Sequence, residues 1–475
     1  MTHEPRRTTA SRRRDLTVLA LEGALLVAAV GVGVVLNRRG AGLHADAAPL
    51  YATWRPHLGW GTVPAVLTAA AVVRFGPGVA RRLSWPRLLA VGWLATVAWT
   101  VSLALVDGWS AGLTERLTPQ AEYLHEVPRV REVPAMLAGF TDRILDFRPD
   151  SWSTHTAGHP PGALLLFVGL DRIGLGGGTS AALACVLVGA TVSVSVPAAL
   201  RWLGDEAGAR AVLPFLVLLP GAVWVGASAD GIFAAVVAAG LALLARPARW
   251  SAALGGALLG FALHLSYGFL LVGLLALTVV ALRAADRLRT LLIAGLGVGA
   301  VTGVFVAAGF WWLDGYHLVV ERYYQGWAAD RPYGYWVWAN LVALLLSTGP
   351  VAGPALARAL GRALAEVRSR LGGAALAEVR SRLGGAPAGL RNSSGAGPGR
   401  DRQSPTVWLP LAAAGTVLAA DLSGLSKAEV ERIWLPFAVW LLVATARLPA
   451  GHRRWWLAGQ AATALAVNHL LWTVS

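Results

Sequence analysis

Long apolar runs, separated by short arginine clusters, dominate this sequence. Thirteen of them approach or reach the roughly 20 residues that a helix needs to cross the hydrocarbon core of a bilayer. The runs are 16–36, 58–75, 88–106, 179–200, 211–228, 231–245, 251–266, 268–282, 290–310, 335–355, 406–420, 433–446 and 455–473. In lipid each backbone N–H and C=O group must be satisfied internally, so such runs predict helices. The sequence therefore predicts an all-α, polytopic integral membrane protein with about 13 transmembrane helices.

The composition points to lipid as the solvent and excludes several other classes. Hydrophobic residues make up 56% of the chain and charged residues only 14%, too apolar for a soluble protein. The net charge is +15, but the arginines lie in short clusters between apolar runs, so no nucleic acid is expected as a partner. Lys427 is the sole lysine, a bias typical of a GC-rich bacterial genome, and a single cysteine, Cys185, excludes an intrachain disulfide.

The positive-inside rule predicts the orientation in a bacterial plasma membrane. Arginines precede the first run, which places the N-terminus in the cytoplasm; the length of that run favours a retained anchor over a cleaved signal peptide. The apolar segment 162–175 is short and ends in Asp171 and Arg172, so we interpret it as a re-entrant or interfacial helix. The C-terminus is then extracytoplasmic. Five basic loops become cytoplasmic: 201–210, 246–249, 283–289, 358–402 and 447–454.

Four regions follow from this layout. Residues 1–86 hold the cytoplasmic tail and two extra spans, and residues 87–355 form a membrane core. Residues 356–405 are expected to be a flexible cytoplasmic loop, because a 12-residue string at 363–374 is repeated without change at 375–386 and a Gly, Ser and Pro-rich stretch follows. Residues 406–475 hold the last spans.

Carboxylates and histidines concentrate in the loops that this orientation places outside. Asp107 stands at the outer mouth of a span, and Glu122 and Glu126 lie four residues apart around Tyr123. Asp230 lies at an outer turn between two apolar runs. An acid at membrane depth is costly and indicates function. At a turn that is exposed to water, an acid is an ordinary solvated group. A functional role and a solvated acid both stay open for Asp230.

Four cations in the later outer loops form a second candidate group. They are Arg322, Arg331, Lys427 and Arg432. Arginine forks and a lysine point charge suit phosphate oxygens. The alternative is ordinary ion pairs with Asp330, Glu429 or Glu431 in the same loops.

The string His159-Pro160-Pro161-Gly162, followed by an apolar helix, a span and a later outer Asp230, resembles the GT-C class of membrane glycosyltransferases. It looks most like the protein O-mannosyltransferase and aminoarabinose-transferase branch, over roughly residues 88–245. In that branch a His- or Lys-Pro-Pro motif closes a large first outer loop and begins a membrane-surface helix. The resemblance implies a GT-C-like core whose outer loop, 107–178, carries juxtamembrane helices.

The resemblance also implies a reaction and roles. The reaction is transfer of a sugar from a polyprenyl-phosphate donor to an extracytoplasmic glycan, lipid or protein of the cell envelope. Asp107 takes the position of the general base, and Glu122 is its rival because the paired acids frequent in the family are missing after that span. His159 and Asp230, with Tyr123 and the four cations, form the expected donor-phosphate or substrate-binding set.

The residue types suit an inverting displacement, in which a carboxylate deprotonates the acceptor hydroxyl and cations stabilise the departing phosphate. The lipid-linked donor is a co-substrate, and no cofactor or metal is expected, since Pro160 disfavours a helical metal pair of His155 and His159. The alternatives are a transporter or flippase for a lipid-linked or polar solute, or a non-catalytic GT-C-like protein. The acids cluster on one predicted side of the membrane, and the sequence shows no pair of repeated halves. Both observations favour an enzyme over a transporter.

Overall fold

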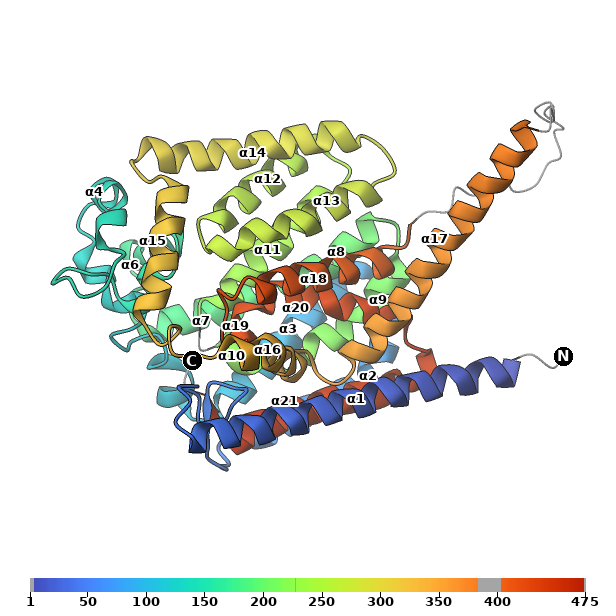
Figure 1. Cartoon of the computed structure of the whole chain (residues 1–475), viewed down its shortest axis with the longest axis horizontal. Coiled ribbons are helices and arrows are strands. Elements are labelled where there is room, and N and C mark those ends of the chain that lie inside the picture. The colour runs from blue at the N-terminus through green and yellow to red at the C-terminus, as the bar shows by residue number, and fades with distance from the viewer. Residues whose placement is uncertain (1–3, 227, 383–402, 474–475) are drawn as a thin grey trace.

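The computed structural model in Figure 1 describes residues 4–226, 228–382 and 403–473, and it is almost entirely helical. The longer helices are α1 (Glu4–Arg38), α2 (Thr62–Arg82), α3 (Trp85–Ala104), α6 (Gly162–Arg172), α7 (Gly178–Gly189), α8 (Val192–Trp202), α9 (Glu206–Val217), α11 (Asp230–Ala245), α12 (Arg249–Leu263), α13 (Val272–Leu282), α14 (Arg287–Ala307), α15 (Trp312–Gln325), α16 (Tyr333–Thr348), α17 (Ala352–Arg382), α18 (Pro405–Leu422) and α21 (Arg453–Leu470). The shorter helices are α4 (Val133–Ala138), α5 (Thr154–Ala157), α10 (Ala222–Val225), α19 (Val430–Ile433) and α20 (Leu435–Leu441). Brief 3-10 or π segments are η1 (Ser110–Thr114), η2 (Tyr123–His125), η3 (Val127–Arg129), η4 (Thr141–Arg143), η5 (Tyr267–Leu271), η6 (Leu442–Arg447) and η7 (Ala450–His452). The predicted helical class is confirmed.

The number of spans is a separate matter. Within the described ranges, 6 helices are long and apolar enough to cross a membrane, or up to 7 if one bent pair counts as a span. The six are Arg12–Arg38, α2, α3, Gly178–Trp202, α14 and α18. Shorter apolar helices cover α11, Tyr267–Leu282 and Leu435–Arg447. Every predicted run overlaps a helix, but the count of thirteen stays a prediction.

The run 335–355 does not form one straight helix. It is divided between α16 and α17, which are bent by 101° relative to each other. Gly349 makes the bend with a φ of 85°, a conformation that favours glycine, and Pro350 follows it directly. A Cβ on Gly349 would lie 2.9 Å from the Gln460 side chain, so the bend also packs closely against α21.

Much of the stretch expected to be a flexible loop is helical. Helix α17 continues to Arg382 and includes the whole first copy of the 12-residue string, whose Ala, Leu, Glu and Arg residues have high helix propensity. Its first turns are tied to α1, because Arg358 forms an ion pair with Asp15 and the Gly353 N–H donates to Glu22 at 3.0 Å. Residues 383–402 lie outside the described residues.

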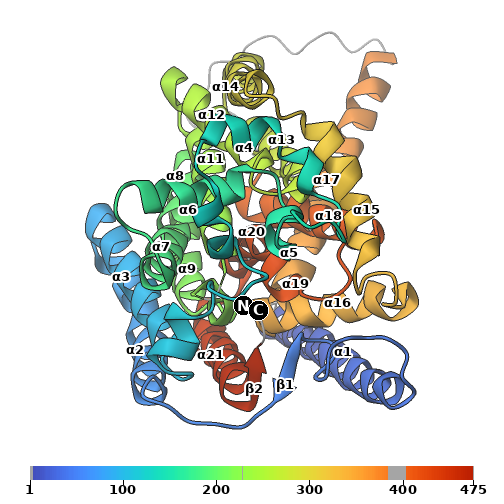
Figure 2. The ribbon, with the colours of Figure 1, turned by 90° about the vertical axis from the view of Figure 1, so that its left-hand side faces the viewer.

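One end of the bundle, here called the loop face, gathers the loops that were predicted to lie outside. Four hydrogen bonds join them: Asp146 to Gln325, Trp312 to Leu263, Lys427 to Tyr323 and Arg432 to Asp230. Figure 2 looks toward this end, with α4, α5 and α6 on the side of the viewer, and α19 lies beside α5, since Arg432 contacts His155. The sequence predicted that these loops lie on one side of the membrane, and in the structure they lie at one end of the helix bundle.

The opposite end, here called the arginine face, gathers the basic loops. The Arg210 guanidinium donates to the carbonyls of Ala80 and Leu83, and that of Arg283 donates to those of Leu244 and Arg246. The two faces thus separate as the positive-inside argument predicts. Which of them contacts the cytoplasm stays a prediction.

The β-strands in the described ranges form a single two-stranded antiparallel sheet. Strand β1 (Ala52–Trp54) pairs with β2 (Leu471–Thr473), with Ala52 opposite Thr473. This pairing holds the end of α21 at the loop face, far from the start of α1 (Figure 1). The sequence analysis missed the sheet, because three-residue strands carry no usable periodicity and their partners lie at opposite ends of the chain.

Two juxtamembrane segments precede α7. Helix α6 has 11 residues and is therefore about 16 Å long, too short to span, which agrees with its exclusion from the spans. The second segment of this outer loop, residues 133–147, forms only α4 and the single turn η4. Phe147 is 82% exposed and has a φ of 64°, so it ends the segment instead of continuing a helical apolar face.

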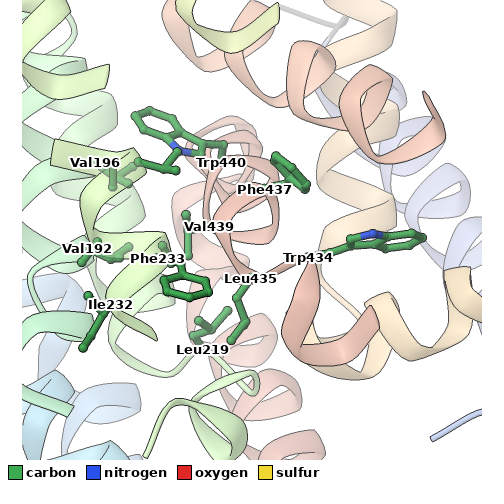
Figure 3. Close-up of a cluster of buried hydrophobic side chains, with 14 of the residues drawn as sticks. Val192, Val196, Leu219, Ile232, Phe233, Trp434, Leu435, Phe437, Val439 and Trp440 are labelled. Carbon is green, nitrogen blue, oxygen red and sulfur yellow. The ribbon is translucent and has the colours of Figure 1, made fainter. Parts of the chain in front are cut away.

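The core at the centre of the bundle positions α19. All seven residues of α20 are buried, and Figure 3 shows its Leu435, Phe437 and Trp440 beside Phe233 of α11 and Val196 of α8. Because α19 leads into α20 with one intervening residue, this packing fixes the place of α19 next to the N-terminus of α11.

Candidate functional site

The HisProProGly string places its histidine through a close backbone contact. Pro161 and Gly162 begin α6 against the end of α12, and a Cβ on Gly162 would lie only 2.4 Å from the carbonyl oxygen of His264. Only glycine permits this approach. His159 is consequently held at the junction of α5, α6 and α11, with its ring 5.7 Å from that of Phe233.

His159 is a neutral imidazole in this environment. Its Nδ1 lies 2.8 Å from the carbonyl oxygen of His155 and 2.9 Å from the Tyr123 hydroxyl. A carbonyl can only accept, so Nδ1 carries the proton and Nε2 is left as an acceptor without a partner among the described residues. Burial lowers the pKa of His159 to about 4, although the nearby Asp230 opposes this shift. Tyr123 in turn stacks on Phe167 at 5.3 Å.

Arg432 is the centre of a buried polar cluster. Its Nη1 donates to Asp230 at 3.1 Å, and its Nη2 donates to Glu429 at 2.7 Å and to Nε2 of His155 at 3.1 Å. The residue is only 6% exposed, and its Nε is buried without a hydrogen-bond partner. We call Glu122, His155, Asp230, Glu429 and Arg432 the Arg432 cluster. The carboxylates of Asp230 and Glu429 thus pair with the guanidinium, while its Nε–H group has no acceptor among the described residues.

Glu122 enters the cluster through His155. Nε2 of His155 accepts from Arg432, and Nδ1 of the same ring lies at an ion-pair distance of 2.8 Å from Oε1 of Glu122. The two atoms are not aligned for a hydrogen bond, so Nδ1 is buried without a hydrogen-bond partner among the described residues. The second oxygen, Oε2, makes no hydrogen bond within the described part of the chain. Glu122 is only 9% exposed. It is therefore a largely buried carboxylate at ion-pair distance from His155, with its Oε2 free to accept.

Glu429 connects the cluster to two more of the candidate cations. Its Oε1 lies 3.4 Å from Nη1 of Arg331, which also donates to the carbonyl of Lys427 at 2.8 Å. Burial alone would raise the pKa of Glu429, but Arg432 and Arg331 lower it overall. The Nζ of Lys427 donates to the carbonyl of Ala328 at 2.9 Å. For Arg331 and Arg432, the ion-pair alternative raised from the sequence describes the contacts present.

Asp107 and Arg322 make their polar contacts outside this cluster. Oδ1 of Asp107 lies 2.6 Å from Nε2 of His57, and Oδ2 accepts from Arg116 at 2.9 Å. Nδ1 of His57 faces the Arg55 carbonyl at 2.7 Å, so both nitrogens of this ring face oxygen atoms.

Arg322 pairs with Asp146 at 2.8 Å, at the rim of the loop face. Among the nine candidate residues, Glu122, Tyr123, His159, Asp230 and Arg432 come together, Arg331 and Lys427 adjoin them, and Asp107 and Arg322 lie apart.

A cavity of about 260 Å³ is lined in part by Phe167, whose ring stacks on Tyr123. Thr118, His125 and Asp171 contribute polar groups to its walls. A larger cavity, of about 660 Å³, opens at the arginine face and shares no residue with the Arg432 cluster. We place the chemistry at the cluster, because ionisable groups converge there and the larger cavity lacks a carboxylate free to act as a base.

The comparisons with protein-family models, with curated proteins and with solved structures return no match. Within the described ranges, no group of three or more His, Cys, Asp or Glu side chains is arranged to hold a metal ion. The expectation that no metal is used stays a prediction.

Sequence reasoning missed His155 as a partner of Arg432, and it named Glu429 only as one of three acids that could pair with the candidate cations. His155 precedes His159 by four residues, and it was considered only as a metal ligand. Glu429 precedes Arg432 by three residues, a spacing at which a helical turn pairs opposite charges. That spacing was a usable signal for Glu429, whereas nothing local indicated that His155 would meet Arg432.

Proposed function

We propose that this chain is a membrane glycosyltransferase that moves a sugar from a polyprenyl-phosphate-linked donor to a cell-envelope acceptor. The observation that carries the proposal is the chain of contacts from Glu122 through His155 to Arg432 at the loop face. It joins a carboxylate with a free oxygen to a guanidinium with a free Nε, the pair of groups that an inverting displacement from a phosphate leaving group requires.

In the proposed step, Oε2 of Glu122 takes the proton of the acceptor hydroxyl. The acceptor oxygen forms a bond to the anomeric carbon while the bond from that carbon to the phosphate oxygen breaks. The electron pair leaves with the polyprenyl phosphate. Arg432 donates from Nε to the departing phosphate, and the neutral Nε2 of His159 accepts from a sugar hydroxyl.

The contacts favour Glu122 over Asp107 as the base. Both oxygens of Asp107 are engaged, one by His57 and one by Arg116, whereas one oxygen of Glu122 is free. An acceptor hydroxyl would have to compete with His57 or Arg116 for an oxygen of Asp107. Asp107 then serves to hold the loop face to the β1–β2 sheet, because its partner Arg116 also donates to the carbonyl of Thr473.

The test is transfer of radiolabelled sugar from defined polyprenyl-phosphate donors to an envelope extract by the purified protein. We expect Glu122→Gln to lower kcat by about 10²–10⁴-fold, the usual contribution of a general base. Asp107→Asn should lower it by less than about tenfold, through weakened packing of the loop face. Glu132→Gln is the matched control, since Glu132 is exposed in the same loop and forms no ion pair among the described residues.

Two results would contradict the proposal. One is that folded wild-type protein transfers sugar from none of the donors. The other is that Glu122→Gln retains the activity of Glu132→Gln. Movement of a labelled lipid across reconstituted vesicles without sugar transfer would support the transporter alternative.

A further inference from the structure

The cavity of about 660 Å³ at the arginine face is lined by two kinds of surface. Pro77 of α2 and Pro214 and Phe215 of α9 form an apolar wall. The ionisable groups around it are Arg81, Arg210, Arg447, Arg453, Arg454 and Asp205. A cavity with an apolar wall and a cationic rim fits an amphiphile with a negatively charged end.

The charges around this cavity are not balanced within the described part of the chain. Asp205 accepts from the backbone N–H of Gly208 at 2.7 Å and so caps α9, and Arg210 pairs with Glu206 at 2.8 Å. The remaining rim arginines, Arg81, Arg447, Arg453 and Arg454, form no ion pair with any described residue. An anion is the missing partner that would offset their mutual repulsion.

The first turn of α21 adds to the excess of positive charge around the cavity. The first turn of this 18-residue helix contains no acid, has no side-chain cap and begins with two arginines, which add positive charge to the positive end of the helix dipole. The Nε of Arg453 is buried without a partner, and burial together with the nearby Arg81 lowers the pKa of Arg453. Helix N–H groups and a free guanidinium donor thus point to an anion site.

Exposed tryptophans indicate at which level of the bilayer the cavity lies. Trp455, next to Arg454 at the rim, is 80% exposed, and Trp250 at the same face is 55% exposed. Tryptophan concentrates at the level of lipid headgroups. We propose that the cavity binds the phosphate headgroup of an anionic glycerophospholipid, with the rim arginines on the phosphate and the apolar wall against the acyl chains. This site is independent of the proposed glycosyltransferase function.

The experiment measures lipid binding to the purified full chain by native mass spectrometry, comparing phosphatidylglycerol with phosphatidylcholine. We expect wild type to bind phosphatidylglycerol at least about tenfold more tightly. Arg447→Gln with Arg454→Gln should weaken that binding about 30-fold, at the usual contribution of an arginine near an anionic surface. Ala207→Phe, which fills the cavity and keeps every arginine, should weaken it as well.

The control is Arg249→Gln with Arg289→Gln, two exposed arginines at the same face that do not line the cavity. The control pair should keep the preference of the wild type. Equal binding of the two lipids by wild type, equal losses in both double variants, or full binding by Ala207→Phe would each overturn the proposal. Inorganic phosphate that protects the protein against thermal unfolding as well as phosphatidylglycerol does would also overturn it, because the ligand would then be free phosphate.

Discussion

At the scale of single residues, the polar groups of the loop face depend on one another for their charge states. Burying an arginine such as Arg432 costs several kcal/mol of desolvation, which only well-placed acceptors offset. Asp230, Glu429 and the imidazole of His155 supply them. The contact between Arg432 and His155 also places the His155 ring 2.8 Å from the proposed base, Glu122.

Glu431, next to Arg432, provides a pH-dependent test of this region. It is fully buried, its Oε1 accepts from the Tyr51 N–H at 3.2 Å, and its Oε2 has no hydrogen-bond partner. Burial raises its pKa to about 7. Between pH 4.5 and 7 the folded protein keeps a proton that the unfolded chain has lost, so this group contributes less stability as the pH rises through that window.

Glu431→Gln imitates the protonated carboxyl at every pH. We expect the variant to gain stability relative to wild type as the pH rises from 4.5 to 7, by up to about 3 kcal/mol, and to keep that advantage at pH 8. Thermal unfolding in detergent at a series of pH values measures this difference. His159, whose lowered pKa has the opposite effect on stability, is present in both proteins and cancels. A difference between the two proteins that does not change with pH would refute the raised pKa.

At the scale of elements, glycines set how closely helices approach. Gly256 of α12 lies against α14, where an added Cβ would be 2.1 Å from the carbonyl oxygen of Ala294. Small residues of this kind let helix backbones meet in membrane proteins. Gly162 does the same for the start of α6 against the end of α12. The position of His159 therefore depends on a backbone contact and not only on its own side chain.

Gly162→Ala tests that contact. The added methyl group would collide with the His264 carbonyl and displace α6, so we expect a loss of about 1–3 kcal/mol in stability and a fall in transfer activity. Gly169→Ala is the matched control in the same helix, since nothing lies within 4 Å of a Cβ there, and it should be neutral or slightly stabilising. Thermal unfolding and the transfer assay measure both variants. Equal behaviour of the two would show that the close approach is not needed.

At the scale of the whole molecule, charge separates along the bundle. The arginine face holds the basic loops, and the loop face holds the Arg432 cluster. The positive-inside rule predicts that the arginine face lies in the cytoplasm. The proposed reaction needs this orientation, because its acceptor lies outside the cytoplasm.

Labelling of single cysteines measures the orientation. Cys185 is the sole cysteine and is buried, so Cys185→Ser supplies a background for new ones. In intact cells, a membrane-impermeant maleimide should label Gln120→Cys at the loop face, whereas Ala285→Cys at the arginine face should react only after permeabilisation. Both residues are exposed in the structure. The reverse pattern would invert the topology and remove the proposed acceptor side.

The candidate site was only partly predictable. Glu122, Asp230 and Arg432 were recognisable as acids and a cation in loops of one side, because orientation follows from arginine counts along the chain. Their convergence on His155 was not, since Arg432 and His155 are 277 residues apart in sequence. Asp107, the first choice as base, has both oxygens occupied by residues that no local pattern connects to it.

The sequence by itself determined the helical class, the shortness of α6 and the sorting of loops to two faces, because hydrophobic length and charge are properties of local segments. The tertiary structure alone decided the bend at Gly349, the pairing of β1 with β2 and the partners of each buried charge. These depend on contacts between segments far apart in the chain, and the free energy of a buried ion pair comes from the neighbours that replace its water. The outer loop 107–178, which supplies Glu122 and His155, is thus one wall of a cluster whose other walls are α11 and α19.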